Sequence, residues 1–171
     1  MKKIAVILLA AVLLLSLCAC AAAPAEKPGT EESSAGIANP MREIKAEEVN
    51  IPMNLPEGAK DVRYFFFDVS SDPFYETRFT LNGKSAFTRA KASSETAPVD
   101  FSGLSYTFET ADAEVDGKPA KVYTCKDCGF AAWVDVAPGV AYIAGYTVAA
   151  SAEEILELAN ACAKPLQGNA G

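Results

Sequence analysis

The longest apolar run of the chain lies within its first twenty residues. Two lysines precede an unbroken apolar stretch, residues 4–15, and small residues follow it up to Cys20. A basic start, a short apolar segment and an exit of small residues are typical of an export signal. A membrane span needs about 20 apolar residues, more than this stretch supplies. We predict a signal peptide over residues 1–19; the alternatives are an uncleaved anchor helix and cleavage by ordinary signal peptidase within residues 21–23.

Hydrophobic side chains become scarce after the signal and return near Pro40. Residues 20–39 are rich in Ala, Pro, Glu, Ser and Gly, and Ile37 is the single branched aliphatic side chain among them. Such a segment cannot bury enough apolar surface to offset the entropy of the chain, so we predict a disordered tether. About 130 residues follow, enough for one domain that buries roughly two thirds of its unfolded surface. We place this domain at residues 40–168.

Alternation of apolar and polar side chains predicts strands through most of the domain. Residues 62–69 contain four consecutive aromatic side chains, Tyr64 to Phe67. Successive strand residues point to opposite faces, so this strand carries rings on both: either both faces are covered or one is a contact surface. Three hairpins with glycine-containing turns follow: residues 75–81 and 84–91 around Asn82-Gly83, residues 106–115 and 118–125 around Asp116-Gly117, and residues 130–136 and 140–148 around Pro138-Gly139.

Helical signals stand at both ends of the domain. Asn39 and Pro40 have the pattern of a cap and first turn, and they predict a short helix to about Glu48. Ser151 and Glu154 match a capping box. The apolar residues behind the box share one helix face: Ile155, Leu158, Ala159 and Cys162. We predict an α+β domain, an antiparallel meander of six to seven strands with the C-terminal helix packed on it and a short N-terminal helix.

The charge balance narrows the class of partner. The whole chain has a net charge of -7. Removing Lys2 and Lys3 with the signal leaves 13 of the 15 basic residues against 22 acidic ones, a net charge of -9. Phosphate backbones and anionic headgroups repel an acidic domain. We therefore expect no nucleic-acid partner, and we expect membrane attachment to depend on a lipid anchor.

Two resemblances point to the same compartment. The exit Leu17-Cys18-Ala19-Cys20 resembles the bacterial lipobox, which implies that Cys20 becomes the lipid-modified mature N-terminus. Two acyl chains hold a protein at a bilayer stably, whereas one anchors only marginally. The resemblance therefore implies a lipoprotein at the cell membrane, lipid-anchored on its extracytoplasmic face.

The second resemblance covers residues 39–163. Its motifs are Asn39–Ile44, Asp100–Gly103, Ala132-Trp133 and Ala141–Ile143. They resemble small uncharacterised lipoproteins of Gram-positive (Firmicutes-type) bacteria with a DUF4367-like C-terminal domain, in which a Trp strand and a Tyr strand lead into a Ser-led, Glu-rich terminal helix. The family has no established activity, so the resemblance implies a fold and a location. This chain departs from the pattern after Ile44, where the helical apolar pattern is missing, and by its pair Cys125 and Cys128.

Few residues suggest catalysis. The chain contains no histidine, which excludes Ser-His-Asp and Cys-His nucleophilic pairs and mixed Cys/His zinc sites. Nucleotide-binding glycine motifs are absent as well. Asp112 to Gly117 has acidic residues at calcium-loop positions, but Tyr123 stands where the bidentate Glu is needed, so we favour a strand ending in an Asp-Gly turn. We predict no cofactor, no metal and no enzymatic activity.

The cysteines leave several alternatives. Cys18 is removed with the signal and Cys20 carries the lipid, so three thiols remain in the domain. Cys125 and Cys128 lie at a predicted hairpin, not at a helix start where a thioredoxin-like pair would stand. Zinc would need a fourth ligand beyond Cys162. A local disulfide is within reach of paired strands, and free thiols are the alternative; Cys162 is expected to be a small buried apolar residue.

One group of aromatic residues is a candidate ligand surface. Trp133 is the only tryptophan, and alternation places it with Ala131 and Asp135. With Tyr142 and Tyr146 on the neighbouring strand, it forms either a stacking face for a ligand or part of the core beneath the terminal helix; we favour the core.

These observations predict a membrane-anchored, extracytoplasmic, non-catalytic module. It would capture a small molecule, sense an envelope condition or serve as a subunit of an envelope complex, with an unknown small molecule or protein as partner. The alternatives are a hydrolase of the cell envelope that uses carboxylates alone and a purely structural envelope protein.

Overall fold

The computed structural model describes residues 40–69 and 71–163. The predicted signal peptide, Cys20 and the tether lie outside the described residues, as do positions 164–168 at the end of the predicted domain.

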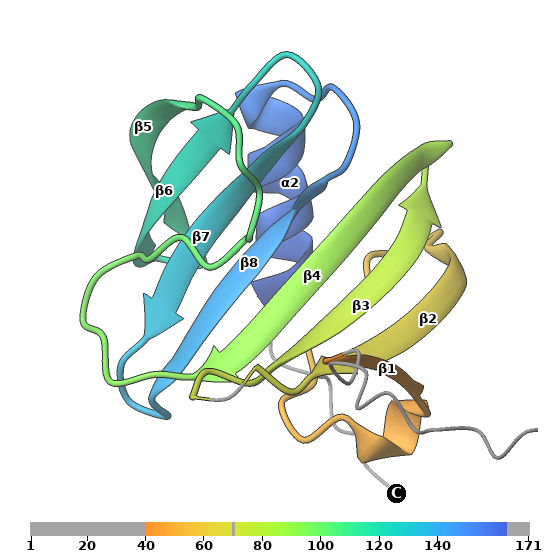
Figure 1. Ribbon diagram of the computed structural model, residues 1–171. Helices are drawn as coiled ribbons and strands as arrows, with labels where there is room; N and C mark the ends of the chain where they lie inside the picture. Colours follow the sequence, from red (N-terminus) through yellow and green to blue (C-terminus); the bar gives the residue numbers. More distant parts are fainter. Residues whose placement is uncertain (1–39, 70, 164–171) are drawn as a thin grey trace, which may run out of the picture. The chain divides into compact units, whose positions relative to one another are not determined.

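A single curved antiparallel sheet of eight strands forms the domain, in the order β1-β2-β3-β4-β8-β7-β6-β5 (Figure 1). The strands are β1 (Met41–Ile44), β2 (Lys60–Phe67), β3 (Phe74–Leu81), β4 (Lys84–Ala92), β5 (Glu109–Val115), β6 (Lys118–Thr124), β7 (Gly129–Asp135) and β8 (Val140–Tyr146). The predicted α+β class is confirmed, but there are eight strands rather than six to seven. They also form two four-stranded meanders, β1–β4 and β5–β8, joined through the pair β4–β8.

Two of the hairpin turns have the backbone that their sequence requires. Asn82 and Gly83 both have positive φ, 51° and 76°, and Asp116 and Gly117 repeat this with 51° and 72°. Asn-Gly and Asp-Gly tolerate this geometry, which matches the twist of the flanking strands. The first turn fixes the register of β3 against β4, with Leu81 opposite Lys84.

The C-terminal helix forms as predicted. Helix α2 (Ala152–Ala163) follows Ser151, whose hydroxyl accepts a hydrogen bond from the Glu154 amide while the Glu154 carboxylate accepts one from the Ser151 amide. The helix packs across β5–β8 (Figure 1). It buries the four predicted residues, Ile155, Leu158, Ala159 and Cys162. Among the described residues, no helix has the length and hydropathy to cross a bilayer.

The predicted N-terminal helix is wrong. Residues 41–44 form strand β1, and a single 3₁₀ turn, η1 (Ala46–Glu48), follows. Nine residues are marginal for a helix that lacks an apolar stripe. Extended pairing with β2 instead buries Ile44 and sets Glu43 beside Arg63. Tertiary pairing therefore outweighs the Asn-Pro start signal.

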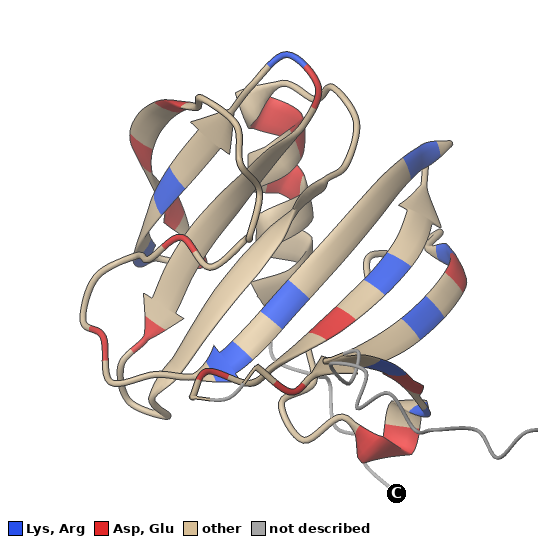
Figure 2. Ribbon diagram, in the orientation of Figure 1, with Lys and Arg blue, Asp and Glu red and all other residues tan. Residues whose placement is uncertain are grey.

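Two loops complete the packing. Residues 49–59 bring Met53 and Leu55 onto the core on the α2 side of the sheet. Residues 93–108 cross the other face over the β5–β8 meander (Figure 1), where Phe101 and Leu104 pack against Phe87 and Phe130. Strands β2, β3 and β4 contain several charged residues (Figure 2).

Candidate functional site

Arginine and phenylalanine side chains gather on the sheet face opposite α2. We call this surface the arginine face. It comprises Arg63 and Phe65 of β2, Glu76 and Arg78 of β3, and Phe87 and Arg89 of β4. Cross-strand pairing aligns them: Arg63 is opposite Arg78, Arg78 is opposite Phe87, and Glu76 is opposite Arg89. Side chains at opposed positions of antiparallel strands lie on the same face, so the register alone assembles the group.

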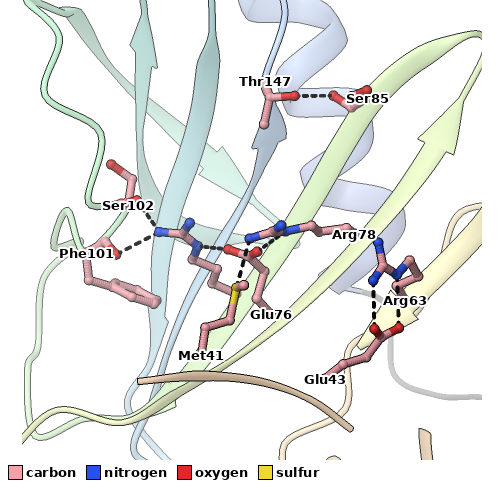
Figure 3. A network of polar contacts seen from close by, with 10 residues as sticks. Met41, Glu43, Arg63, Glu76, Arg78, Ser85, Phe101, Ser102 and Thr147 are labelled. Atoms are coloured by element: carbon pink, nitrogen blue, oxygen red, sulfur yellow. Dashed lines mark hydrogen bonds and ion pairs between the residues drawn. The ribbon is translucent and has the colours of Figure 1, made fainter. Parts of the chain in front are cut away.

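Glu76 is the buried centre of this face (Figure 3). Its carboxylate, 1% exposed, accepts a hydrogen bond from Arg78 Nε on one oxygen and from Arg89 Nε, at 2.5 Å, on the other. Arg89 also donates to the backbone oxygens of Phe101 and Ser102, which fastens the 93–108 loop to the sheet. A buried carboxylate needs such partners, because an unpaired buried charge is costly. The cluster of one carboxylate and two guanidinium groups has a net charge of +1.

Aromatic rings hold the arginines in place. Phe65 lies between two guanidinium groups, with Arg63 Cζ 5.1 Å and Arg78 Cζ 4.5 Å from its ring centroid. Arg89 lies over Phe74 at 5.0 Å and over Phe87 at 5.1 Å. All four distances fall within the range of cation–π attraction. The guanidinium groups are therefore oriented before any ligand arrives.

A cavity of about 460 Å³ opens on this face. Glu76, Arg78, Phe87 and Arg89 line it, together with Leu104 of the long loop. Its remaining polar lining comes from Asp61, Thr80, Ser85 and Thr147. Arg89 is mostly buried, whereas the Arg78 side chain is 47% exposed. Arg78 is therefore the accessible cation of the cavity.

A second ion pair at the edge of the face is exposed, with more than half of each side chain open to solvent. Arg63 donates two hydrogen bonds to Glu43, at 2.9 and 2.7 Å (Figure 3). These hydrogen bonds lower the pKa of Glu43 and raise the pKa of Arg63. Arg63 does not line the cavity, although it stacks on the same ring as Arg78. This difference makes it a natural control for Arg78.

The predicted aromatic surface lies on the α2 side of the sheet. Trp133 and Tyr146 are buried, and Tyr142 is half-buried and stacked on Trp133 with ring centroids 5.4 Å apart. Burial raises the pKa of Tyr142 and of Tyr146. These positions agree with the core alternative, and Trp133 lies with Ala131 and Asp135 as the alternation predicts.

Trp133 and Tyr142 also line a cavity of about 360 Å³, which Tyr146 does not reach. Lys118 spans this cavity between Asp116 and Asp135, at 3.4 and 3.3 Å. Burial opposes the charge of Lys118, but its hydrogen bonds with the two carboxylates outweigh burial and raise its pKa. Because two carboxylates already neutralise Lys118, this cavity attracts an anionic ligand less than the arginine face does.

The remaining candidate residues are placed as follows. Cys125 and Cys128 face each other across the β6–β7 turn with their sulfurs 2.8 Å apart, and Cys162 is buried on α2, where burial raises its pKa to about 12. The acidic stretch 112–117 is the end of β5 and its turn, as favoured from the sequence. No group of three or more metal-binding side chains occurs in the described part of the chain.

Sequence reasoning missed the arginine face, although one signal for it was present. A two-residue turn at Asn82-Gly83 sets Leu81 opposite Lys84, and counting back along both strands sets Glu76 opposite Arg89. Two opposite charges at one cross-strand position, within an aromatic stretch, point to a buried pair. The closure of the face by Ser102 and Leu104 comes from a long loop, whose path no local pattern reveals.

Comparisons with known protein families, with curated proteins and with solved structures found no match to this chain. The resemblance to DUF4367-like lipoproteins therefore remains a prediction.

Proposed function

We propose that this chain is a lipid-anchored protein of the extracytoplasmic membrane face that binds a small organic carboxylate on its arginine face. The carrying observation is the cavity of about 460 Å³ lined by two guanidinium groups that share one buried carboxylate. Small-molecule sites typically enclose about 300 to 1,000 Å³, with a few placed polar groups among apolar ones. The cavity fits both parts of that description.

The accessible guanidinium of Arg78 favours an anionic group on the ligand. Glu76 offsets one of the two guanidinium charges, and Asp61, the other acidic residue of the lining, brings the formal charge of the cavity to zero, so the attraction for a carboxylate is local to Arg78. Arg78 uses Nε and Nη2 for Glu76 and Met41, and its Nη1 forms no hydrogen bond with the described residues. A guanidinium edge matches a carboxylate geometrically. Phe87 and Leu104 offer apolar contact to the body of the ligand.

The location rests on the N-terminal sequence. The basic start, the apolar run and Cys20 support export and lipid attachment. In native cells, we expect the mature chain to begin at a lipid-modified Cys20 and to fractionate with membranes, and Cys20→Ser to move it out of the membrane fraction. Mass spectrometry that finds an unmodified Cys20 or an intact Met1 would contradict this part of the proposal.

The carboxylate-dependent hydrolase has less support. A general acid needs a carboxyl group whose pKa is raised. The pKa values of Glu43, Glu48 and Glu154 are instead lowered, each by hydrogen bonds to its carboxylate. A purely structural envelope protein would give no ligand response in the experiment below.

A thermal-shift screen of the purified protein tests the binding proposal. The screen contains four classes of compound: monocarboxylates with an apolar group, amino acids, phosphate esters and neutral glycans. A ligand at 100 times its Kd adds about 2.7 kcal/mol to the free energy of unfolding. We expect the largest rise in Tm from monocarboxylates. No shift with any class would count against a small-molecule site and favour a protein partner.

Two matched variants locate the site. Arg78→Met removes the accessible cation of the cavity, and Arg63→Met removes the other guanidinium stacked on Phe65. Both keep an unbranched side chain over the ring. We expect Arg78→Met to abolish the ligand-induced shift and Arg63→Met to preserve it. Equal effects of the two substitutions would place the ligand elsewhere.

A further inference from the structure

The turn between β6 and β7 brings two thiols together. Cys125 follows β6 and Cys128 precedes β7, and the Cys125 amide donates a hydrogen bond to the Cys128 carbonyl at 2.9 Å. This bond closes the turn and holds the two Sγ atoms 2.8 Å apart. The register of β6 and β7 sets Thr124 opposite Gly129, so Cys125 and Cys128 are the next opposed positions. Opposed residues of antiparallel strands have Cα atoms about 4.5 to 5.5 Å apart, inside the range that a disulfide accepts. Oxidation therefore requires little movement of either strand.

The two thiols differ in access. Cys128 is 3% exposed, and burial is the main cause that raises its pKa to about 12. Cys125 is half-buried and lines a hollow of about 330 Å³ together with Thr107, Glu109 and Lys126. The amide of Cys128 donates a hydrogen bond to Cys125 Sγ at 3.1 Å. An external reagent thus reaches Cys125 first.

A disulfide here would contribute little as a structural staple. The stabilisation by a cross-link grows with the length of the loop that it closes. This loop is the four-residue turn from Cys125 to Cys128, which a backbone hydrogen bond already closes. The reduced and oxidised forms are therefore both compatible with the same fold.

The geometry points to a reversible dithiol–disulfide couple in which Cys125 exchanges with external low-molecular-weight disulfides and Cys128 resolves the mixed disulfide. Cys125 thiolate attacks one sulfur of R–S–S–R, forms Cys125–S–S–R and releases RS⁻. Cys128, after loss of its proton to water, attacks Cys125 Sγ and releases the second RS⁻. Two thiols are oxidised, and one external disulfide is reduced to two thiols. This couple lies on a different turn from the arginine face and does not depend on the carboxylate site.

Redox titration of the full-length protein tests the couple. The protein is equilibrated in buffers of graded glutathione to glutathione disulfide ratio, free thiols are alkylated, and the chain is digested with trypsin and a glutamate-specific protease. Trypsin cuts after Lys126, so the disulfide appears as two joined peptides, and cuts after Glu153, Glu154 or Glu157 separate Cys162 from Cys128. We expect one reversible transition from the free to the joined peptides.

Single variants test the division of roles. With glutathione disulfide, the Cys128→Ala variant should accumulate a glutathione adduct on Cys125. In the folded Cys125→Ala variant, Cys128 should stay unmodified until the protein is unfolded. Tm measurements confirm that both variants fold. Failure to join the peptides at the most oxidising ratio overturns the proposal, as does a link that persists at the most reducing ratio. Equal reaction rates of the two variants overturn the assigned roles.

Discussion

Glu76 holds more of the structure together than its single charge suggests. It connects β3 to β4 directly, and through Arg89 it connects the sheet to the 93–108 loop. Glu76→Gln keeps the shape of the side chain and leaves Arg89, 13% exposed, without its ionic partner. Breaking a buried pair typically costs about 3 to 5 kcal/mol. We expect the free energy of unfolding to fall by about 3 kcal/mol, the lower end of this range, because the Arg78 side chain is half exposed to solvent. Urea unfolding measures this loss.

The exposed pair on the same face is the control for this substitution. Glu43→Gln removes the partner of Arg63, but both side chains remain open to water. Exposed ion pairs contribute little because solvent screens them. The unfolding midpoint should hardly change. Equal losses from Glu43→Gln and Glu76→Gln would contradict the role assigned to burial.

At the scale of single residues, the sequence predicts the pairing of Glu76 with Arg89 but not the burial of Glu76. The turn at Asn82-Gly83 determines that Glu76 faces Arg89, which could be derived by counting. The alternation of β3 also separates its apolar residues correctly, since Phe79 and Leu81 lie in the core on the α2 side. The same alternation suggests, however, that the Glu76 side chain is exposed to solvent. Its burial depends on the loop around Ser102, and loop positions follow from tertiary contacts that no strand period encodes.

Local hydrogen bonds determine where helix α2 begins. The capping box forms as predicted, and Glu154 also binds Lys84 at the start of β4. The hydrogen bond from Lys84 and then the one from the Ser151 amide lower the pKa of Glu154 below its usual value of 4.5. A lowered folded-state pKa means that the contribution to stability is complete above about pH 4.5 and is lost as the pH falls through the folded-state value.

Glu154→Gln should therefore lower Tm at neutral pH, and the difference from the wild type should shrink as the pH falls from about 6 to 3. Calorimetry across this range measures both curves. Glu153→Gln, in the same helical turn, is the matched control, because no described residue hydrogen-bonds to the Glu153 side chain. A difference that stays constant with pH would show that the carboxylate charge is not what stabilises the cap.

The packing of β7 against β8 depends on a missing side chain. A Cβ on Gly145 would collide with the Gly129 carbonyl oxygen and would lie 2.5 Å from Phe130 Cβ, and backbone atoms in a central strand cannot move aside easily. Overpacking of this kind typically costs about 1 to 3 kcal/mol. We expect Gly145→Ala to lower the urea midpoint by a corresponding amount. Ala144→Ser, at the neighbouring position of β8, adds an atom without creating this contact and serves as a control. A urea midpoint of Gly145→Ala equal to that of the wild type would contradict the close approach.

The wrongly predicted helix at the start of the domain shows that a local signal does not predict a strand whose partner lies far along the chain. Its start signal, Asn39-Pro40, describes a few residues, whereas the choice of strand depends on β2 twenty residues later. Arg42 lies over Phe66 at 5.1 Å and Ile44 is buried against the sheet, contacts that exist only once β2 is in place. Hairpins with two-residue turns were predictable because partner and turn are adjacent; the pairs β1–β2 and β4–β8 were not, since the sequence carries no turn that joins them.

The whole domain is asymmetric in how its two meanders are covered. Strands β7 and β8 are buried on both faces, by α2 on one side and by the 93–108 loop on the other. The β1–β4 meander is covered by residues 49–59 on one face, and its arginine face lines an open cavity. Regions with fewer buried contacts open at lower free energy than the core. The β1–β3 side should therefore unfold locally more often than the β7–β8 side.

Native-state hydrogen exchange should resolve this asymmetry. We expect the amides of β7, β8 and α2 to exchange only with global unfolding, and those of β1, β2 and β3 to exchange earlier as one group. A carboxylate bound between Arg78 and Arg89 contacts β3 and β4, so it should slow exchange in the early group and leave edge strand β5 unchanged. Uniform protection across the sheet would contradict the local opening. Protection by ligand that appears on β5 rather than on β2 and β3 would contradict the position of the site, because the sheet order sets β5 farthest from β1.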